Sequence, residues 1–247
     1  MTGPIAALPM YDRPETAAAN DALWAAIRAR LGHGPDRLTR ADDLWPIWLS
    51  PDLLLAQTCG LPFRARLHDK VTLIGTPDYG LPGCPPGHYR SVFVARAEGG
   101  PTTLDAAAGR RFAYNDALSQ SGWAAPQAHM AALGLPFGAL LKSGGHRGSA
   151  LAVAEGRADF AALDAVTWAL IQEHDGFSTA LRVIAETVPT PGLPLIAAPG
   201  TDPTPLFAAF AGAVQDLSAK DRATLHLEGL VAIPAQAYLV QPLPTAP

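Results

Sequence analysis

Two serines at the start of an expected helix are the residues best suited to bind a ligand. In Ser119-Gln120-Ser121-Gly122, the hydroxyls and the first backbone amides of the helix can donate several hydrogen bonds to a phosphate, phosphonate or carboxylate. Serine is also the ordinary N-cap residue of helices. The segment therefore predicts either an anion site that includes Gln120 or a plain helix cap.

A glycine-rich loop and a carboxylate offer a second group of polar side chains. The loop Gly144–Ser149 precedes a helix and could approach an anion closely, although it lacks the spacing of a nucleotide-binding glycine loop. His146 in this loop is either a ligand contact or a surface histidine. Asp164 directly follows an apolar run, so it either caps the next helix or offers a carboxylate to an amine or hydroxyl of a ligand.

Further polar residues lie where predicted strands end. They are Tyr11, Gln57, Thr58 and Tyr79. Because open α/β sheets bind ligands beyond the carboxyl ends of their strands, these residues are candidate ligand contacts. The two tyrosines either line a pocket and donate their hydroxyls or pack at the edge of the core.

Enzyme signatures are mostly missing from the sequence. There is no G-x-S-x-G nucleophile elbow and no H-E-x-x-H zinc motif, and none of the seven histidines pairs with another at a spacing of four. We therefore predict that the protein is not an enzyme and carries no cofactor or metal, while a metal site assembled from distant positions stays open.

The elements that must position these side chains alternate in the manner of an α/β protein. Strands are expected at 5–9, 53–56 (where a helix is the alternative), 70–75, 91–95, 111–114, 139–142, 159–163, 181–185 and 193–197. Helices are expected over 14–31, 42–48, 123–133, from the 143–149 loop to 155, over 164–173, and twice after 203.

Composition narrows the class of protein. Of 247 residues, 49% are hydrophobic and 16% charged, which is enough to bury a core in one or two domains. The net charge of −4 argues against a nucleic-acid binder, whose affinity needs clustered Lys and Arg. No apolar stretch reaches the roughly 20 residues of a membrane helix, so membrane insertion is not expected, and the chain starts without the pattern of a signal peptide.

The chain has two cysteines, Cys59 and Cys84. Each lies in a turn-like setting, so a disulfide between them is conceivable, and two thiols in a cytosolic protein fit equally well.

The order of several motifs resembles the phosphonate-binding group of type II periplasmic binding proteins, the substrate-capturing components of phosphate, phosphite or phosphonate ABC importers. The resemblance runs from Leu8–Asp12 to Gly229–Val231. Its most specific parts are Arg111–Asp116 with Ser119–Gly122, Ser143–His146 with Ser149, Ala152–Asp164, and Pro191–Pro194. Gln120 stands where phosphonate binders of the family usually carry a small hydroxyl residue.

The resemblance implies a two-lobed α/β fold in which each lobe is a mixed sheet flanked by helices. Residues 1–93 and 190–247 would form lobe 1 and residues 94–189 lobe 2, joined by two hinge strands at 91–96 and 183–187. Ser119, Gln120, Ser121 and His146 would match the headgroup site, Tyr11 and Tyr79 the aromatic residues of lobe 1, and Asp164 the acidic residue facing the rest of the ligand.

The function that this resemblance implies is capture of a small, phosphate- or phosphonate-like anion for an ABC transporter permease. We expect a monomer, periplasmic by resemblance, with the absence of a signal peptide favouring a cytoplasmic alternative. One rival is an enzyme on the same fold, related to pyrimidine or thiamine-precursor chemistry, whose product formation would depend on His146 or Asp164. The other is an intracellular ligand sensor.

Overall fold

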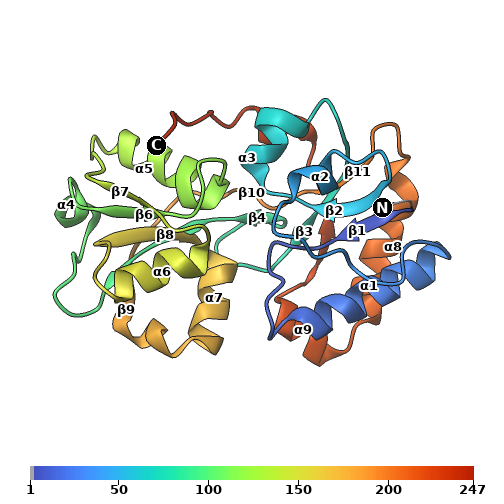
Figure 1. Ribbon diagram of the computed structural model, residues 1–247, viewed down its shortest axis with the longest axis horizontal. Helices are drawn as coiled ribbons and strands as arrows, with labels where there is room; N and C mark the ends of the chain where they lie inside the picture. The colour runs from blue at the N-terminus through green and yellow to red at the C-terminus, as the bar shows by residue number, and fades with distance from the viewer. Residues whose placement is uncertain (1–2) are drawn as a thin grey trace. The chain divides into compact units, whose positions relative to one another are not determined.

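The computed structural model describes residues 3–247 and forms two compact units (Figure 1). Unit 1 contains the chain up to His88 together with Pro191–Val240, and unit 2 contains Tyr89–Thr190 together with Gln241–Pro247. Residues 241–247 thus group with unit 2, whereas the sequence analysis placed them in the first lobe.

The chain changes units within two very short strands. These are β4 (His88–Tyr89) and β10 (Thr190–Pro191), which pair with each other in a separate two-stranded sheet. The expected hinge segments lie elsewhere. They belong to β5 (Ser91–Arg96) and β9 (Leu181–Glu186), two neighbouring strands inside the sheet of unit 2.

Unit 1 is built on a five-stranded mixed sheet. Its order is β1 (Ile5–Ala7), β2 (Leu53–Gln57), β11 (Leu195–Ala197), β3 (Thr72–Asp78) and β12 (Gly229–Val231). Because β11 runs antiparallel to both β2 and β3, and β1 is parallel to β2, β1, β2 and β3 all end at the same edge. That edge carries Tyr11, Gln57 and Tyr79.

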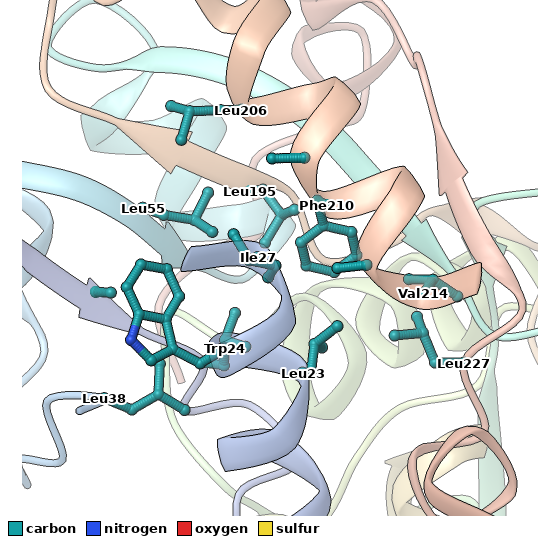
Figure 2. Packing of buried hydrophobic residues seen from close by; sticks show 14 of the residues in the cluster. Leu23, Trp24, Ile27, Leu38, Leu55, Leu195, Leu206, Phe210, Val214 and Leu227 are labelled. Atoms are coloured by element: carbon teal, nitrogen blue, oxygen red, sulfur yellow. The ribbon is translucent and has the colours of Figure 1, made fainter. Parts of the chain in front are cut away.

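One face of this sheet is covered by α1 (Ala17–Leu31) and α8 (Pro203–Asp216). Leu23, Trp24 and Ile27 recur at helical spacing on α1 and pack with Phe210 of α8 over Leu55 and Leu195 of the sheet, as Figure 2 shows. The helix ends at Gly32, which adopts the left-handed conformation that glycine tolerates best. The unit also contains α9 (Ala219–Leu225).

The opposite face of the unit 1 sheet packs against shorter elements. They are α2 (Trp45–Trp48), α3 (Gly60–Pro62), the π-helical segment η1 (Phe63–Leu67) and α10 (Ala235–Leu239). Alternate residues of each strand point to opposite faces, so Ala6 belongs to the first cluster while Ile5 and Ala7 belong to this one.

Unit 2 is built on a second five-stranded mixed sheet. Its order is β7 (Leu140–Lys142), β6 (Phe112–Tyr114), β8 (Phe160–Asp164), β5 and β9. Strands β7, β6 and β8 are parallel, and β5 is antiparallel to its neighbours. The carboxyl ends of the three parallel strands therefore meet at one edge.

Helices cover both faces of the unit 2 sheet. Val92 and Val94 face α6 (His146–Ala154) and α7 (Ala165–His174). Phe93 and Ala95 face the π-helical segment η2 (Gln120–Ala124), which continues as α5 (Ala125–Ala132). The unit also contains α4 (Leu104–Ala107) and the 3₁₀ helix η3 (Gly176–Ala180).

The predicted alternation of strands and helices is confirmed, including the strand at 53–56, which the structure extends to Gln57. Several boundaries differ by up to three residues, and two of them bear on the site. Helix begins at Gln120 rather than 123, and His146 is the first residue of α6 rather than part of a loop. Eight elements were missed because two to five residues are too few to show a period. They are β4, β10, β12, α3, η1, α4, η3 and α10.

Candidate functional site

Five of the predicted site residues gather at one edge of the unit 2 sheet. Ser119, Gln120 and Ser121 follow β6, His146 follows β7, and Asp164 is the last residue of β8. Because these three strands are parallel and adjacent, their carboxyl ends place the five residues side by side.

Ser119 acts as a helix cap. Its Oγ accepts a hydrogen bond of 3.0 Å from the backbone N–H of Gly122, at the start of η2. Ser119 therefore caps the helix, and because its Oγ only accepts in this bond, the hydroxyls of both Ser119 and Ser121 stay candidate donors to a ligand.

Ser121 pairs with His146. Its Oγ lies 2.8 Å from His146 Nε2, and its backbone carbonyl accepts a hydrogen bond from Ser91 Oγ at the same distance, 2.8 Å. Ser121 is 3% exposed, so its side chain is held in place by buried partners.

Asp164 is also a cap, as one of the two sequence interpretations held. Its Oδ1 accepts from the Thr167 backbone N–H at 2.8 Å and its Oδ2 from the Thr167 hydroxyl at 2.5 Å. Oδ2 lies 3.5 Å from His146 Nε2. The same carboxylate therefore starts α7 and faces the histidine.

Burial lowers the pKa of His146 below its ordinary value. The negative charge of Asp164 and the backbone carbonyl of Ala162 both act in the opposite direction, but burial has the larger effect. The imidazole is therefore neutral at pH 7 and carries one N–H donor and one acceptor nitrogen.

Ser121, His146 and Asp164 are the residue types of a hydrolase triad, but their geometry differs from one. In a triad the histidine uses one nitrogen for the serine and the other for the carboxylate. Here Nε2 faces both Ser121 Oγ and Asp164 Oδ2. The carboxylate does not lie behind the ring, so this arrangement suits ligand binding better than activation of the serine.

Gly122 and Asn115 belong to the same region, and the sequence analysis did not single them out as ligand contacts. A Cβ on Gly122 would lie 1.9 Å from Asn115 Oδ1 and 3.0 Å from His146 Cε1. Asn115 Oδ1 is buried and has no hydrogen-bond partner among residues 3–247. The signal that could have revealed this packing is the glycine that directly follows the second serine.

Gln120 contacts Thr190. Its Nε2 lies 3.4 Å from the hydroxyl of Thr190 in β10, and the residue is 3% exposed. A hydrogen bond of this length is weak.

The other four predicted residues gather in unit 1. The rings of Tyr11 and Tyr79 meet edge to face with centroids 5.0 Å apart. Gln57 donates a 2.8 Å hydrogen bond from Nε2 to the Tyr79 hydroxyl. Thr58 is fully buried, and its Oγ1 has no hydrogen-bond partner in the described part of the chain.

A small cavity lies beside the two tyrosines. Its volume is about 20 Å³, which suits one water molecule and is far too small for a phosphonate. Tyr11, Gln57 and Tyr79 line it together with mostly apolar side chains such as Leu8 and Phe210. Thr58 is not among the residues that line it.

The structure also bears on the two cysteines, on metal binding and on membrane-spanning helices. Cys59 and Cys84 are half-buried separate thiols, so the disulfide that the sequence left open is not present. Residues 3–247 hold no cluster of three or more His, Cys, Asp or Glu side chains that could bind a metal. Within the same range, no helix is both long and apolar enough to cross a membrane.

Comparison with known proteins gives one family match. The model of a family described as "ABC transporter, phosphonate, periplasmic substrate-binding protein" matches residues 55–235, well over half of the 247 residues. No curated protein sequence matches the chain significantly.

Solved structures with the same fold cover nearly the whole chain at low identity. PhnD1 from Prochlorococcus marinus in complex with methylphosphonate has a TM-score of 0.76 at 15% identity, covering 95% of this chain and 94% of that one. A binding protein component of an ABC phosphonate transporter from Pseudomonas aeruginosa has a TM-score of 0.68 at 18% identity, with coverages of 96% and 83%. MatC from Rhodopseudomonas palustris with bound malate has a TM-score of 0.62 at 15% identity, with coverages of 97% and 94%.

Proposed function

Because this chain belongs to the phosphonate-binding family of periplasmic ABC transporter substrate-binding proteins, we propose that it captures a small oxyanion for an importer. The ligand is phosphate- or phosphonate-like. We expect this ligand to bind residues of both units, which would act as the two lobes. The conformation with ligand bound would then differ from the empty one and would be the form that a permease recognises.

The observation that carries this proposal is the Ser121–His146 pair at the start of η2. The first backbone N–H groups of a helix have no partner within it and attract negative charge. The Ser121 hydroxyl lies at that helix start and is oriented by a neutral histidine. Together these groups form a set of dipolar donors for an oxyanion that does not depend on a Lys or Arg.

Two neighbouring structures support an anion as the ligand. One was solved with methylphosphonate and the other with malate, and both molecules are anionic. They also differ in shape, so the fold accepts more than one headgroup. In this chain Gln120 replaces the small hydroxyl residue of well-studied phosphonate binders, and it narrows the choice of headgroup by occupying buried space.

The remaining predicted contacts take the part of the ligand beyond the headgroup. Tyr11, Tyr79, Gln57 and Thr58 would provide the unit 1 side of the site, with Thr58 Oγ1 a buried hydroxyl that lacks a partner in residues 3–247. Asp164 would face an amine or hydroxyl of the ligand. Replacing Asp164 with Asn should therefore weaken binding of an aminoalkyl ligand and change binding of phosphate little.

A thermal-shift screen tests the proposal directly. The panel contains phosphate, phosphite, methylphosphonate, an aminoalkylphosphonate, sulfate and malate. A ligand at 100 times its Kd adds about 2.7 kcal/mol to the free energy of unfolding, which raises the Tm visibly. We expect phosphorus oxyanions to raise the Tm, and a response confined to sulfate or malate would contradict the proposed ligand class.

Ser121→Ala in the same assay tests the site. A hydrogen bond to a charged group is worth about 1.5–3 kcal/mol, so we expect the Kd of the best ligand to rise by about ten- to a hundredfold. Ser218→Ala removes a serine that caps α9 in unit 1 and should leave the Kd unchanged. Equal affinities in all three proteins would exclude Ser121 from the site.

A further inference from the structure

The chain passes between the two units a third time, close to residue 240. After α10 in unit 1, the segment Gln241–Pro247 groups with unit 2. We call these seven residues the return segment. Three of them, Pro242, Pro244 and Pro247, are prolines, which favour an extended polyproline conformation without internal hydrogen bonds. The segment must therefore obtain its contacts from the surface on which it lies.

The return segment is fastened to unit 2 at Thr245. Its backbone carbonyl accepts hydrogen bonds from Trp123 Nε1 at 2.8 Å and from Gln127 Nε2 at 3.2 Å. Its backbone N–H donates to Gln127 Oε1 at 2.9 Å, and its hydroxyl lies 2.8 Å from Gln127 Nε2. One amide side chain thus pairs with both the donor and the acceptor of a single residue.

The partners of Thr245 are well held. Trp123 is 2% exposed and packs against Phe112, Tyr114 and Phe137 in the aromatic cluster of unit 2. The Thr245 carbonyl of the return segment accepts the hydrogen bond of the Trp123 indole N–H. Losing this acceptor would be costly, because a buried donor would then lack a partner. The anchor therefore rests on the core of unit 2.

The chain just before the return segment is held in the core of unit 1. Tyr238 in α10 is 1% exposed, packs edge to face on Phe63, and shares a 2.5 Å hydrogen bond with the hydroxyl of Thr76. Only two residues separate this tyrosine from the start of the return segment. Tyr238 is thus anchored in the core of unit 1, and Thr245 is anchored to the core of unit 2.

The length between the two anchors is short. From Val240 to Thr245 the chain advances five residues, which span at most about 18 Å when fully extended. Proline restricts the backbone and removes most of the slack of a flexible linker. Any displacement that would take these two points more than about 18 Å apart must first break the Thr245 contacts.

We propose that the return segment is a tether that limits how far the two units can separate and transmits that limit to the ligand site. Trp123 and Ser121 lie in the same π-helical segment, Gln120–Ala124, and Gln127 lies in the helix that continues it. Strain on Thr245 therefore acts on the helix whose first turn holds the candidate headgroup residues. The effect on ligand affinity rests on the proposed function, whereas the restraint itself does not.

The test compares the full chain with two variants in the absence of ligand. One variant ends at Val240. The other is Gln127→Ala, which keeps the segment and removes the three hydrogen bonds between Gln127 and Thr245. Gln236→Ala, an exposed glutamine in α10, is the matched control.

The first measurement is hydrogen exchange of the Trp123 indole, with its NMR signal assigned by Trp123→Phe. We expect exchange at least about tenfold faster in both variants than in the full chain and the control, because local opening sets the exchange rate. Equal exchange in all four proteins would show that the anchor does not form in solution and would overturn the proposal.

The second measurement is the radius of gyration from small-angle X-ray scattering. Loss of seven residues alone should reduce it by about 0.2 Å in a compact chain, so an increase in the shortened variant and in Gln127→Ala reports greater separation of the units. An unchanged or smaller radius in both variants, with the anchor shown to form, would overturn the tether. Because no ligand is present, this result is independent of whether the protein binds phosphonates.

Discussion

Gly122 is the residue at which the candidate site tolerates least change. A methyl group there would overlap Asn115 Oδ1, 1.9 Å away, so Gly122→Ala must displace either the asparagine or the π-helical segment. Such overpacking costs about 1–3 kcal/mol. We expect chemical denaturation to show this loss, and we expect the double variant Gly122→Ala with Asn115→Ala to recover much of it. No recovery in the double variant would mean that another contact excludes the methyl group.

His146 makes the stability of the protein depend on pH. Its pKa in the folded protein lies below that of an unfolded chain, about 6.5. Between those two values the unfolded chain binds more protons, so the free energy of unfolding falls as the pH drops below about 6.5. His129, whose pKa burial also lowers, acts in the same direction. Denaturant titrations at pH 7.5 and pH 5 should therefore show a smaller loss for His146→Gln than for the natural chain, and equal losses would contradict the burial of this imidazole.

At the residue scale, the sequence predicted where the polar site residues lie along the strands better than it predicted which side chains they contact. Polar residues directly after apolar runs identified the strand ends, because that pattern is local. The contact of Asn115 with Gly122 and the shared nitrogen of His146 could not be predicted, since both depend on how three strands lie side by side. The capping role of Ser119 was one of two local possibilities, and the structure shows that hydrogen bond.

At the scale of elements, burial decides which leucines hold a helix in place. Leu23 on α1 is 2% exposed inside the unit 1 core, whereas Leu133 at the end of α5 is 55% exposed. We expect Leu23→Ala to lower the free energy of unfolding by about 2–5 kcal/mol and Leu133→Ala to change it by no more than about 0.5 kcal/mol. Equal effects in thermal or denaturant unfolding would contradict the packing of α1 against α8 in Figure 2.

Long elements could be predicted because a helix such as 17–31 repeats its apolar residues several times, while β10 and β12 offer two or three residues each. The start of the helix after β6 was placed three residues late for another reason. A π-helical turn holds more residues than an α turn, so the period of the following helix does not extend back through it.

For the whole molecule, the order of segments along the chain predicts which fragments can fold. Most of unit 2 is continuous, from Tyr89 to Thr190, whereas unit 1 needs segments from both sides of it. A fragment ending at His88 lacks β11 and α8, which supply Leu195 and Phe210 to its core. We expect this fragment to show little ordered structure by circular dichroism and the 89–190 fragment to show a cooperative thermal transition. A cooperative transition in the first fragment would contradict the composition of unit 1.

The π-helical segments have a consequence for how binding could change during evolution. In each unit one such segment follows a strand that ends at the candidate site, Phe63–Leu67 in unit 1 and Gln120–Ala124 in unit 2. A π turn arises when one residue is inserted into an α-helix, and each residue turns an α-helix by about 100°. Loss of a single codon after Ser121 within this segment would therefore turn the Ser121 hydroxyl away from His146 relative to the rest of the helix. In this fold, a ligand preference can be gained or lost through a one-residue insertion or deletion, without any change in the residue types that line the site.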